Sequence, residues 1–211
     1  MSAPAIPATC STALKEWATV LEAMSRGEQL VLIRKGGLLE PGSGFEMVSE
    51  PFLFYPTFEH QAVHYLRPPY QAYFDQALAR RAPEGMVRFE LVGCAMWSTE
   101  SRDPSVVERL QAFHIYNESF IAQRLRWKPD QPLAIVVVRV FRLAEPKSAL
   151  VLPSYAGCKS WVALDSTVPL ANAQPVLDDA QFERRLQDVR PLLAADPARL
   201  RRGHPDGHLL D

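Results

Sequence analysis

The sequence predicts a mixed α+β fold with a mainly antiparallel sheet and flanking helices. The segment 133–143 holds four valines, an isoleucine and a phenylalanine, a composition typical of a strand. Residues 87–97 alternate between apolar and other side chains, with the period of a half-buried strand. Apolar residues recur at three- and four-residue steps within 14–24 and 182–189, as in helices. Because strands and helices alternate irregularly along the chain, we expect α+β rather than α/β.

The first apolar segment is predicted to form a helix over residues 11–27. Its stripe runs from Leu14 through Trp17 to Met24, and Gly27 suits a left-handed helix end. Trp17 is therefore expected in the core. Further helices are predicted at 70–81, after the Asp103-Pro104 pair, after Asn117 as a cap, and after a capping box made by Asp178 and Gln181.

Shorter apolar runs complete the predicted sheet. Residues 29–34 and 52–55 are short and apolar, and Pro56 is expected to end the second run. Two further short strands are expected near 149–152 and 160–164, each after a turn.

Composition divides the chain into three parts. Residues 1–10, with two prolines and small side chains, are predicted to form a flexible arm. Residues 11–165 are expected to form one α+β domain, a size that buries a core without disulfides. Residues 166–211 are expected to form a helical C-terminal appendage with a frayed tail.

Charge and cysteine content exclude several classes of protein. The 211 residues carry a net charge of −1, which argues against a wholly basic surface but leaves room for a local basic groove. Cys10, Cys94 and Cys158 form no disulfide framework or metal-binding pair, which favours a reduced, cytoplasmic setting. The longest apolar run, 133–138, is far too short to cross a membrane. We expect no membrane contact, resident metal or cofactor.

An enzymatic alternative is centred on Glu59, His60 and His64. The two histidines are four residues apart and would share one face if this segment were helical, a spacing compatible with metal ligands. Beyond Glu59, a third ligand would have to come from His114 or Cys94. A metal-dependent nuclease or another hydrolase is therefore kept as the alternative function.

Two other catalytic patterns are weaker. Asp130 with Glu145 and Lys147 resembles the acidic-x-Lys pattern of nucleases, but an unbroken strand over 133–143 would hold the two acids far apart. Cys158 could act as a nucleophile, although a cysteine is more often a small buried side chain.

Cations lie beside aromatic residues or glycines at several points in the chain, a pattern that suits phosphates and bases. Arg34 and Lys35 precede two glycines, and the string 126–128 places an arginine and a lysine around Trp127. The simpler interpretations are a hairpin turn and a tryptophan in the core. The predicted nucleic-acid-binding residues are Arg34, Lys35, Tyr55, His60, Arg126, Lys128 and Lys159.

Three blocks resemble a bacterial family catalogued only as a domain of unknown function. They are Leu14-Lys-Glu-Trp17 through Arg34-Lys-Gly-Gly37, then Phe54-Tyr-Pro-Thr-Phe-Glu-His-Gln61, and Tyr155-Ala-Gly-Cys-Lys-Ser-Trp161. Arg126-Trp-Lys-Pro129 is similar to the same family, and the resemblance covers about 13–165. It implies a setting beside restriction-endonuclease-like domains, and thus a nuclease partner in restriction or defence.

A second resemblance concerns the fold alone. Gly27-Glu-Gln29 followed by a strand ending in Arg34 is similar to the opening of PUA, ASCH and EVE domains, although Gln29 stands where those domains usually have lysine or threonine. The resemblance implies a barrel-like sheet and binding of RNA or of a modified base in DNA. It is an analogy of fold only.

The sequence therefore favours a non-catalytic nucleic-acid-binding module, with the cations on phosphates and with Tyr55 and His60 on a base. A third possibility is a protein-interaction subunit that docks a partner through Phe182, Leu186 and Val189 of a C-terminal helix. The oligomeric state is left open.

Overall fold

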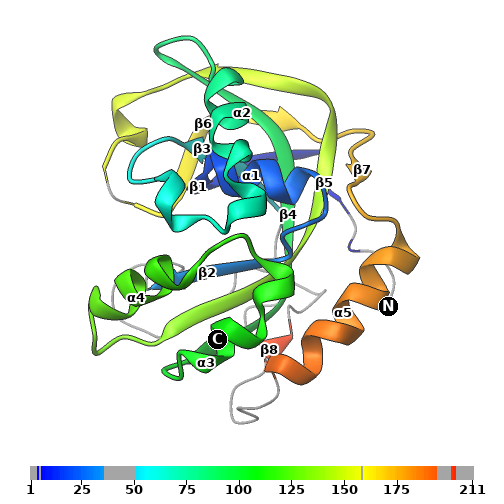
Figure 1. The fold of residues 1–211 in the computed structure, drawn as a ribbon. Helices are drawn as coiled ribbons and strands as arrows, with labels where there is room; N and C mark the ends of the chain where they lie inside the picture. Colours follow the sequence, from blue (N-terminus) through cyan, green and yellow to red (C-terminus); the bar gives the residue numbers. More distant parts are fainter. Residues whose placement is uncertain (1–3, 5, 36–50, 158, 194–200, 203–211) are drawn as a thin grey trace, which may run out of the picture.

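The computed structural model describes residues 4, 6–35, 51–157, 159–193 and 201–202. Its sheet places two long strands next to each other in the middle of the chain's fold (Figure 1). The hydrogen-bonded order is β2 (Val31–Lys35), β5 (Leu133–Leu150), β4 (Met86–Ser101), β3 (Phe52–Thr57), β1 (Thr9–Trp17) and β6 (Trp161–Pro169). Two short strands join this path, with β7 (Gln174–Pro175) on β5 and β8 (Arg201–Arg202) on β4.

The predicted fold class is confirmed. Every strand pair is antiparallel except β1 with β3, and helices flank the sheet. Within the described ranges no pairing joins β2 to β6, so the sheet is not closed into a barrel. The strand predicted over 133–143 is present and continues through Pro146 to Leu150. Asp130 and Glu145 therefore lie along a single strand direction and not together, as expected.

Strands β4 and β5 bend and connect the two halves of the molecule (Figure 1). Their register shifts between Phe89 and Leu91 and again between Ala95 and Trp97, and such bulges increase the local bend and twist of a strand. The bent sheet has two hydrophobic cores. The first lies between the helices and strands such as β2 and β5, and the second is formed mainly by β1, β3, β4, β5 and β6.

The helix predicted over residues 11–27 is wrong for its first half. Residues up to Trp17 form β1, and only Ala18–Ser25 form the helix α1. β1 pairs with β3 on one side and β6 on the other. Because it is buried on both faces, its apolar side chains show no period of two and match a helical stripe equally well. Trp17 is nevertheless in the core, as predicted, and Gly27 (φ +71°) follows the helix end.

The remaining helices begin close to the predicted residues. They are α2 (Ala72–Ala79), α3 (Ser105–Arg109), α4 (Glu118–Arg126) and α5 (Asp179–Leu193), with short 3₁₀ turns η1 (Val63–Tyr65), η2 (Pro68–Tyr70), η3 (Gln111–Phe113) and η4 (Pro153–Tyr155). Asn117 Oδ1 caps α4 by accepting from the backbone N–H of Ser119 at 3.0 Å. Asp178 and Gln181 form the reciprocal capping box, at 2.7 and 3.0 Å. In the part of the chain that the structure describes, no helix is long and apolar enough to cross a membrane.

Helix α5 packs against the rest of the chain. Phe182, Leu186 and Val189, which the sequence offered to a partner, are at most 3% exposed in the first core. That face is therefore not available for docking while the helix is in place. Arg139 of β5 reinforces the contact because its guanidinium pairs with Asp179 and lies 5.0 Å from the Phe182 ring centre.

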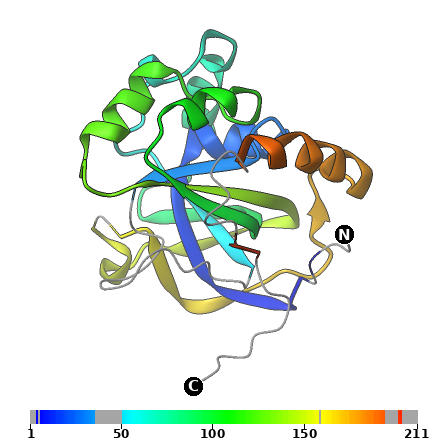
Figure 2. The ribbon, with the colours of Figure 1, turned by 90° about the horizontal axis from the view of Figure 1, so that it is seen from below.

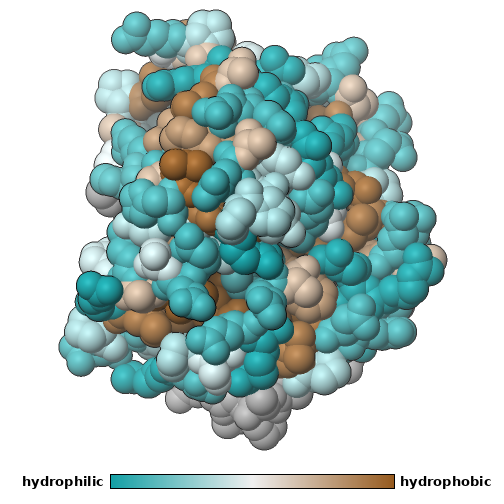
Figure 3. Space-filling view, viewed as in Figure 1, coloured by the Kyte–Doolittle hydropathy of each residue, from teal (hydrophilic) through white to brown (hydrophobic). Residues whose placement is uncertain are grey.

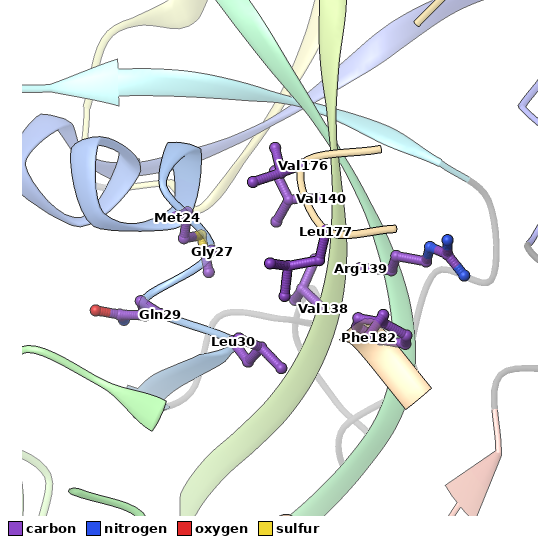
Figure 4. Close-up of a pocket in the computed structure, with 10 residues that line it drawn as sticks. All are labelled: Met24, Gly27, Gln29, Leu30, Val138, Arg139, Val140, Val176, Leu177 and Phe182. Carbon is purple, nitrogen blue, oxygen red and sulfur yellow. The ribbon is translucent and has the colours of Figure 1, made fainter. Parts of the chain in front are cut away.

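A small cavity marks the packing seam beneath α5 (Figure 4). Figure 4 shows Leu177 pointing into this seam opposite Gly27, while the Arg139 side chain points away. The cavity measures about 10 Å³, barely the space of one water molecule. A Cβ on Gly27 would lie 2.4 Å from the Leu177 side chain, so the seam is tight and holds no ligand.

Gly93 of β4 lets two aromatic rings lie against the strand. A Cβ at this position would lie 2.7 Å from the Phe52 ring and 2.9 Å from the Phe54 ring. We expect Gly93→Ala to lower the free energy of unfolding by about 1–3 kcal/mol, the cost of overpacking a core. Urea unfolding measures this. The Gly93→Ala/Phe52→Leu double variant should lose less than the two single variants added together, and simple additivity would contradict the steric explanation.

His114 predicts a pH dependence of stability. Burial lowers its pKa to about 4, against the hydrogen bond to the Val107 carbonyl oxygen, which raises it. Between pH 6.5 and 4 the unfolded chain then binds more protons than the folded chain, so the free energy of unfolding falls as the pH falls. From pH 7.5 to pH 5 the loss should be about 2 kcal/mol.

Urea unfolding of His114→Gln at the two pH values checks this contribution. The variant should lose less stability on acidification than the unmodified chain. His64→Gln, which removes an exposed histidine, is the control and should retain the full loss. Equal losses in all three proteins would contradict the assignment to His114.

Candidate functional site

The main concave feature is a cleft of about 1220 Å³. Four parts of the chain line it: the end of α4, the segment after β3, the loop between α2 and β4, and the residues between η4 and β6. Figures 1 and 2 both place α4 and the turn η4 on the same side of the molecule. Its floor carries residues of β1, β2 and β3.

All seven residues that the sequence proposes for nucleic-acid binding line this cleft. Arg34 and Lys35 come from β2, Tyr55 from β3 and His60 from the segment after β3. The other three, Arg126, Lys128 and Lys159, come from the end of α4 and from the segment before β6. The fold thus brings together side chains separated by more than a hundred residues, although their use in binding stays a prediction.

Arg34 forms a hydrogen-bonded network at the cleft floor. Its guanidinium donates to Glu16 Oε2 at 2.8 Å, to the Lys15 carbonyl oxygen at 3.0 Å and to Ser160 Oγ at 3.0 Å. The Arg34 and Glu16 side chains are only 16% and 9% exposed. Arg34 therefore joins β2 to β1 and to the start of β6, and several of its donors are already engaged.

Lys35 points to the other side of β2 and holds α4. It is 4% exposed, and its Nζ donates to the Leu125 carbonyl oxygen in the last turn of α4 at 2.9 Å. Burial lowers the pKa of this amine, and nearby Arg102 adds to the effect. A cation at a helix C-terminus satisfies a carbonyl that has no partner within the helix. Lys35 thereby positions the exposed residues that follow, from Arg126 to Lys128.

Exposed cations lie around the mouth of the cleft. Arg126 and Lys128 are exposed, and the ammonium group of Lys128 lies 4.7 Å from the ring centre of Trp127. Lys159 is also exposed and donates to the Ser154 carbonyl oxygen at 2.8 Å. These side chains can reach an anion in the cleft without breaking a buried contact.

Tyr55 and His60 differ in accessibility. Tyr55 is 8% exposed, its ring meets those of Phe89 and Tyr155 edge-on, and burial raises the pKa of its hydroxyl. His60 is exposed and has a φ of +60°. Lys128 has a φ of +47°, so two of the three non-glycine residues with positive φ in the described ranges line the cleft. Such conformations cluster at functional sites.

Sequence reasoning left out several residues of the cleft. Trp127 is 49% exposed, so the alternative that it fills the core is wrong. Arg80, Arg81 and Arg88 line the wall formed after α2. They follow or flank a predicted helix end, where basic residues are common for purely local reasons, and their sequence carries no separate signal. Trp127 did have a signal, the cations on either side of it.

The cleft has a strong positive charge. Ten lysine and arginine side chains line it against five glutamates, in a chain of net charge −1. Three of the glutamates are paired with arginines. Glu16 binds Arg34, Glu22 binds Arg80 at 3.2 Å, and Glu90 binds Arg80 at 2.5 Å and Arg88 at 2.8 Å. Low-dielectric walls concentrate such a potential and attract an anionic ligand.

The proposed metal ligands do not come together. The segment from Glu59 to His64 is not helical, so the four-residue spacing of His60 and His64 does not place them on one helix face. Glu59 and His60 line the cleft, whereas His64 does not. Across the described ranges, no three His, Cys, Asp or Glu residues could hold one metal ion. Burial raises the pKa of the Cys94 thiol to about 12, and Cys158 lies outside the described residues.

Two solved structures are similar to this chain in part. A mutant form of the ASCH protein from Zymomonas mobilis aligns over 86% of this chain and 98% of its own, with 9% identity and a TM-score of 0.40. The ASCH structure from the same organism aligns over 83% and 93%, with 10% identity and a TM-score of 0.40. No curated protein matches the chain.

The family model gives a firmer assignment. It matches residues 13–188, which include every strand from β2 to β7, most of β1 and most of α5. The resemblance seen in the three sequence blocks is thereby confirmed, and the chain belongs to the family described as a domain of unknown function, DUF1802.

Proposed function

We propose that this protein is a nucleic-acid-binding module that holds its ligand in the cleft. The observation that carries the proposal is the charge of that cleft, ten cationic side chains against five glutamates in a chain that is otherwise slightly acidic. Phosphates dominate the affinity of proteins for nucleic acids, and lysine and arginine are their usual partners. The module binds without catalysing a reaction.

The cations divide into two roles. Arg126, Lys128 and Lys159 are exposed and contact phosphates directly. Arg34 and Lys35 lie deeper and hold β1, β2 and α4 in position through the contacts described above. A substitution at the first group should change affinity alone, whereas one at the second group should also change stability.

Tyr55 and His60 serve base recognition. His60 is exposed at the cleft wall and has both a donor and an acceptor nitrogen in its neutral form. Tyr55 lies at the floor, where a base edge or a modification on a base would meet an apolar, aromatic surface. The resemblance seen in the sequence adds a setting beside a restriction or defence nuclease. The free cysteines Cys10 and Cys94 suit a reducing cytoplasm.

The two alternative functions have less support. The hydrolase based on Glu59, His60 and His64 needs side chains that lie apart, since His64 is outside the cleft. The partner-docking helix buries its apolar face within the chain. Figure 3 also shows a mainly hydrophilic surface on the face seen in Figure 1, with hydrophobic side chains only in small separate patches.

Removing two exposed cations should weaken binding and its dependence on salt. We expect the Arg126→Gln/Lys128→Gln variant to bind labelled oligonucleotides at least about tenfold more weakly at low salt, since each lost phosphate contact releases fewer counterions. The slope of log K against log salt should become shallower by about 1.4 for a single strand. Fluorescence anisotropy of DNA and RNA probes with EDTA present measures both quantities.

A matched variant controls for net charge. Arg109→Gln/Arg184→Gln removes the same charge from α3 and α5, outside the cleft, and should keep both affinity and slope. Unlabelled polyglutamate at equal charge should displace the probe poorly. Failure of every probe to bind at low salt, or equal displacement by polyglutamate, would overturn the proposal.

A further inference from the structure

We infer that Trp127 is a stacking platform for an unpaired base, so that the cleft takes single-stranded rather than duplex nucleic acid. This inference rests on the proposed function and adds the class of ligand. It starts from the exposure of one tryptophan. Trp17 and Trp97 are 7% and 8% exposed and Trp161 is half-buried, whereas Trp127 is 49% exposed and lines the cleft.

The indole of Trp127 is held in place although it is exposed. The Leu125 carbonyl oxygen, two residues earlier, accepts a hydrogen bond from buried Lys35, which anchors the end of α4 to β2. After the tryptophan, Lys128 adopts a φ of +47°, and its carbonyl oxygen accepts from the Gln131 N–H at 3.0 Å. An aromatic side chain on an anchored turn loses little conformational freedom on binding.

The ring of Trp127 already carries a cation. Lys128 Nζ lies 4.7 Å from the ring centre, which brings a positive charge to the place where a stacked nucleotide has its phosphate. An aromatic surface beside an ammonium group is the combination that single-strand-binding grooves use.

Another wall of the cleft repeats this combination. Phe58 lies under the guanidinium of Arg81, which is 5.0 Å from the ring centre, and both residues line the cleft. At the floor, Lys15 Nζ lies 5.7 Å from the ring centre of Tyr55. Three aromatic rings, each with a cation, thus lie along one concave surface.

This arrangement favours an unpaired strand over a duplex. The faces of bases in a duplex are covered by their neighbours, and only their edges are open in the grooves. Stacking on a tryptophan inside a cleft therefore requires a base that is unpaired or turned out of the helix. A flat, exposed basic surface would have suited a duplex, and the cations here line a cleft of about 1220 Å³ instead.

Anisotropy titrations of one sequence in three forms test the inference. The probes are a labelled single strand, its duplex, and a strand of equal length whose central residues are abasic. The unmodified protein should bind the single strand at least about tenfold more tightly than the duplex. Trp127→Ala should weaken binding of the single strand by roughly 5- to 150-fold, the range for loss of one stacked base. It should leave binding of the abasic strand nearly unchanged.

Two further variants make the test specific. Trp127→Phe keeps an aromatic face and should restore most of the affinity. Leu78→Ala removes an exposed apolar side chain outside the cleft and should change nothing. Because Trp127 is half exposed, its variants should keep the thermal unfolding temperature of the unmodified protein.

The outcomes separate this inference from the proposed function. Equal affinity for single strand and duplex, or an equal loss on the abasic and intact strands in Trp127→Ala, would overturn the stacking role while leaving nucleic-acid binding intact. The absence of binding to all three probes would overturn both.

Discussion

The fold depends on the ion pair between Arg34 and Glu16, because it joins the two ends of an open sheet. In the order of strands, β2 lies at one end, and β1 and β6 lie at the other. Arg34 of β2 donates to Glu16 and to the Lys15 carbonyl oxygen of β1, and to Ser160 just before β6. A single guanidinium thus connects strands whose backbones do not pair in the described ranges, and it holds the sheet in a barrel-like curve.

An ion pair that is largely removed from water is sensitive to the loss of one partner. Without Arg34, the Glu16 carboxylate would keep its donor from the Trp17 N–H but lose its compensating charge. Breaking a buried pair in this way costs on the order of 3–5 kcal/mol, much more than an exposed pair contributes. Lys35, the next residue along β2, points to the opposite face and anchors α4. The alternation of a strand therefore assigns one residue to the sheet and one to the cleft wall.

Local signals in the sequence predicted the parts of the fold that local chemistry determines. Asn117 and the Asp178–Gln181 pair cap their helices because the hydrogen bonds involved span only two or three residues. The valine-rich strand was equally clear. The N-terminal strand was not, because Leu14 and Ala13 are both fully buried and only pairing with β3 and β6, far away in sequence, decides their conformation.

The candidate site was predictable to the same extent. Cations beside aromatic residues marked Arg126 and Lys128 correctly as neighbours of one cleft, since an exposed tryptophan between them is visible in the sequence. The engagement of Arg34 with Glu16 could not be foreseen, because it depends on how the sheet curls. Arg80 and Arg88 were missed for the same reason. They reach the cleft only through the packing of α2 against α1 and the bend of β4.

The distribution of charge gives the cleft its selectivity for position. The cleft holds a surplus of five positive charges in a chain whose total is −1, so the rest of the chain carries a net charge of about −6 by the same count. A polyanion approaching elsewhere is therefore repelled and is steered toward the one concave surface of opposite sign. Three glutamates within the cleft, Glu16, Glu22 and Glu90, neutralise arginines at its floor and on one wall. The uncompensated cations remain on the α4 side next to Trp127, so the charges of the cleft and its exposed aromatic ring point to the same wall.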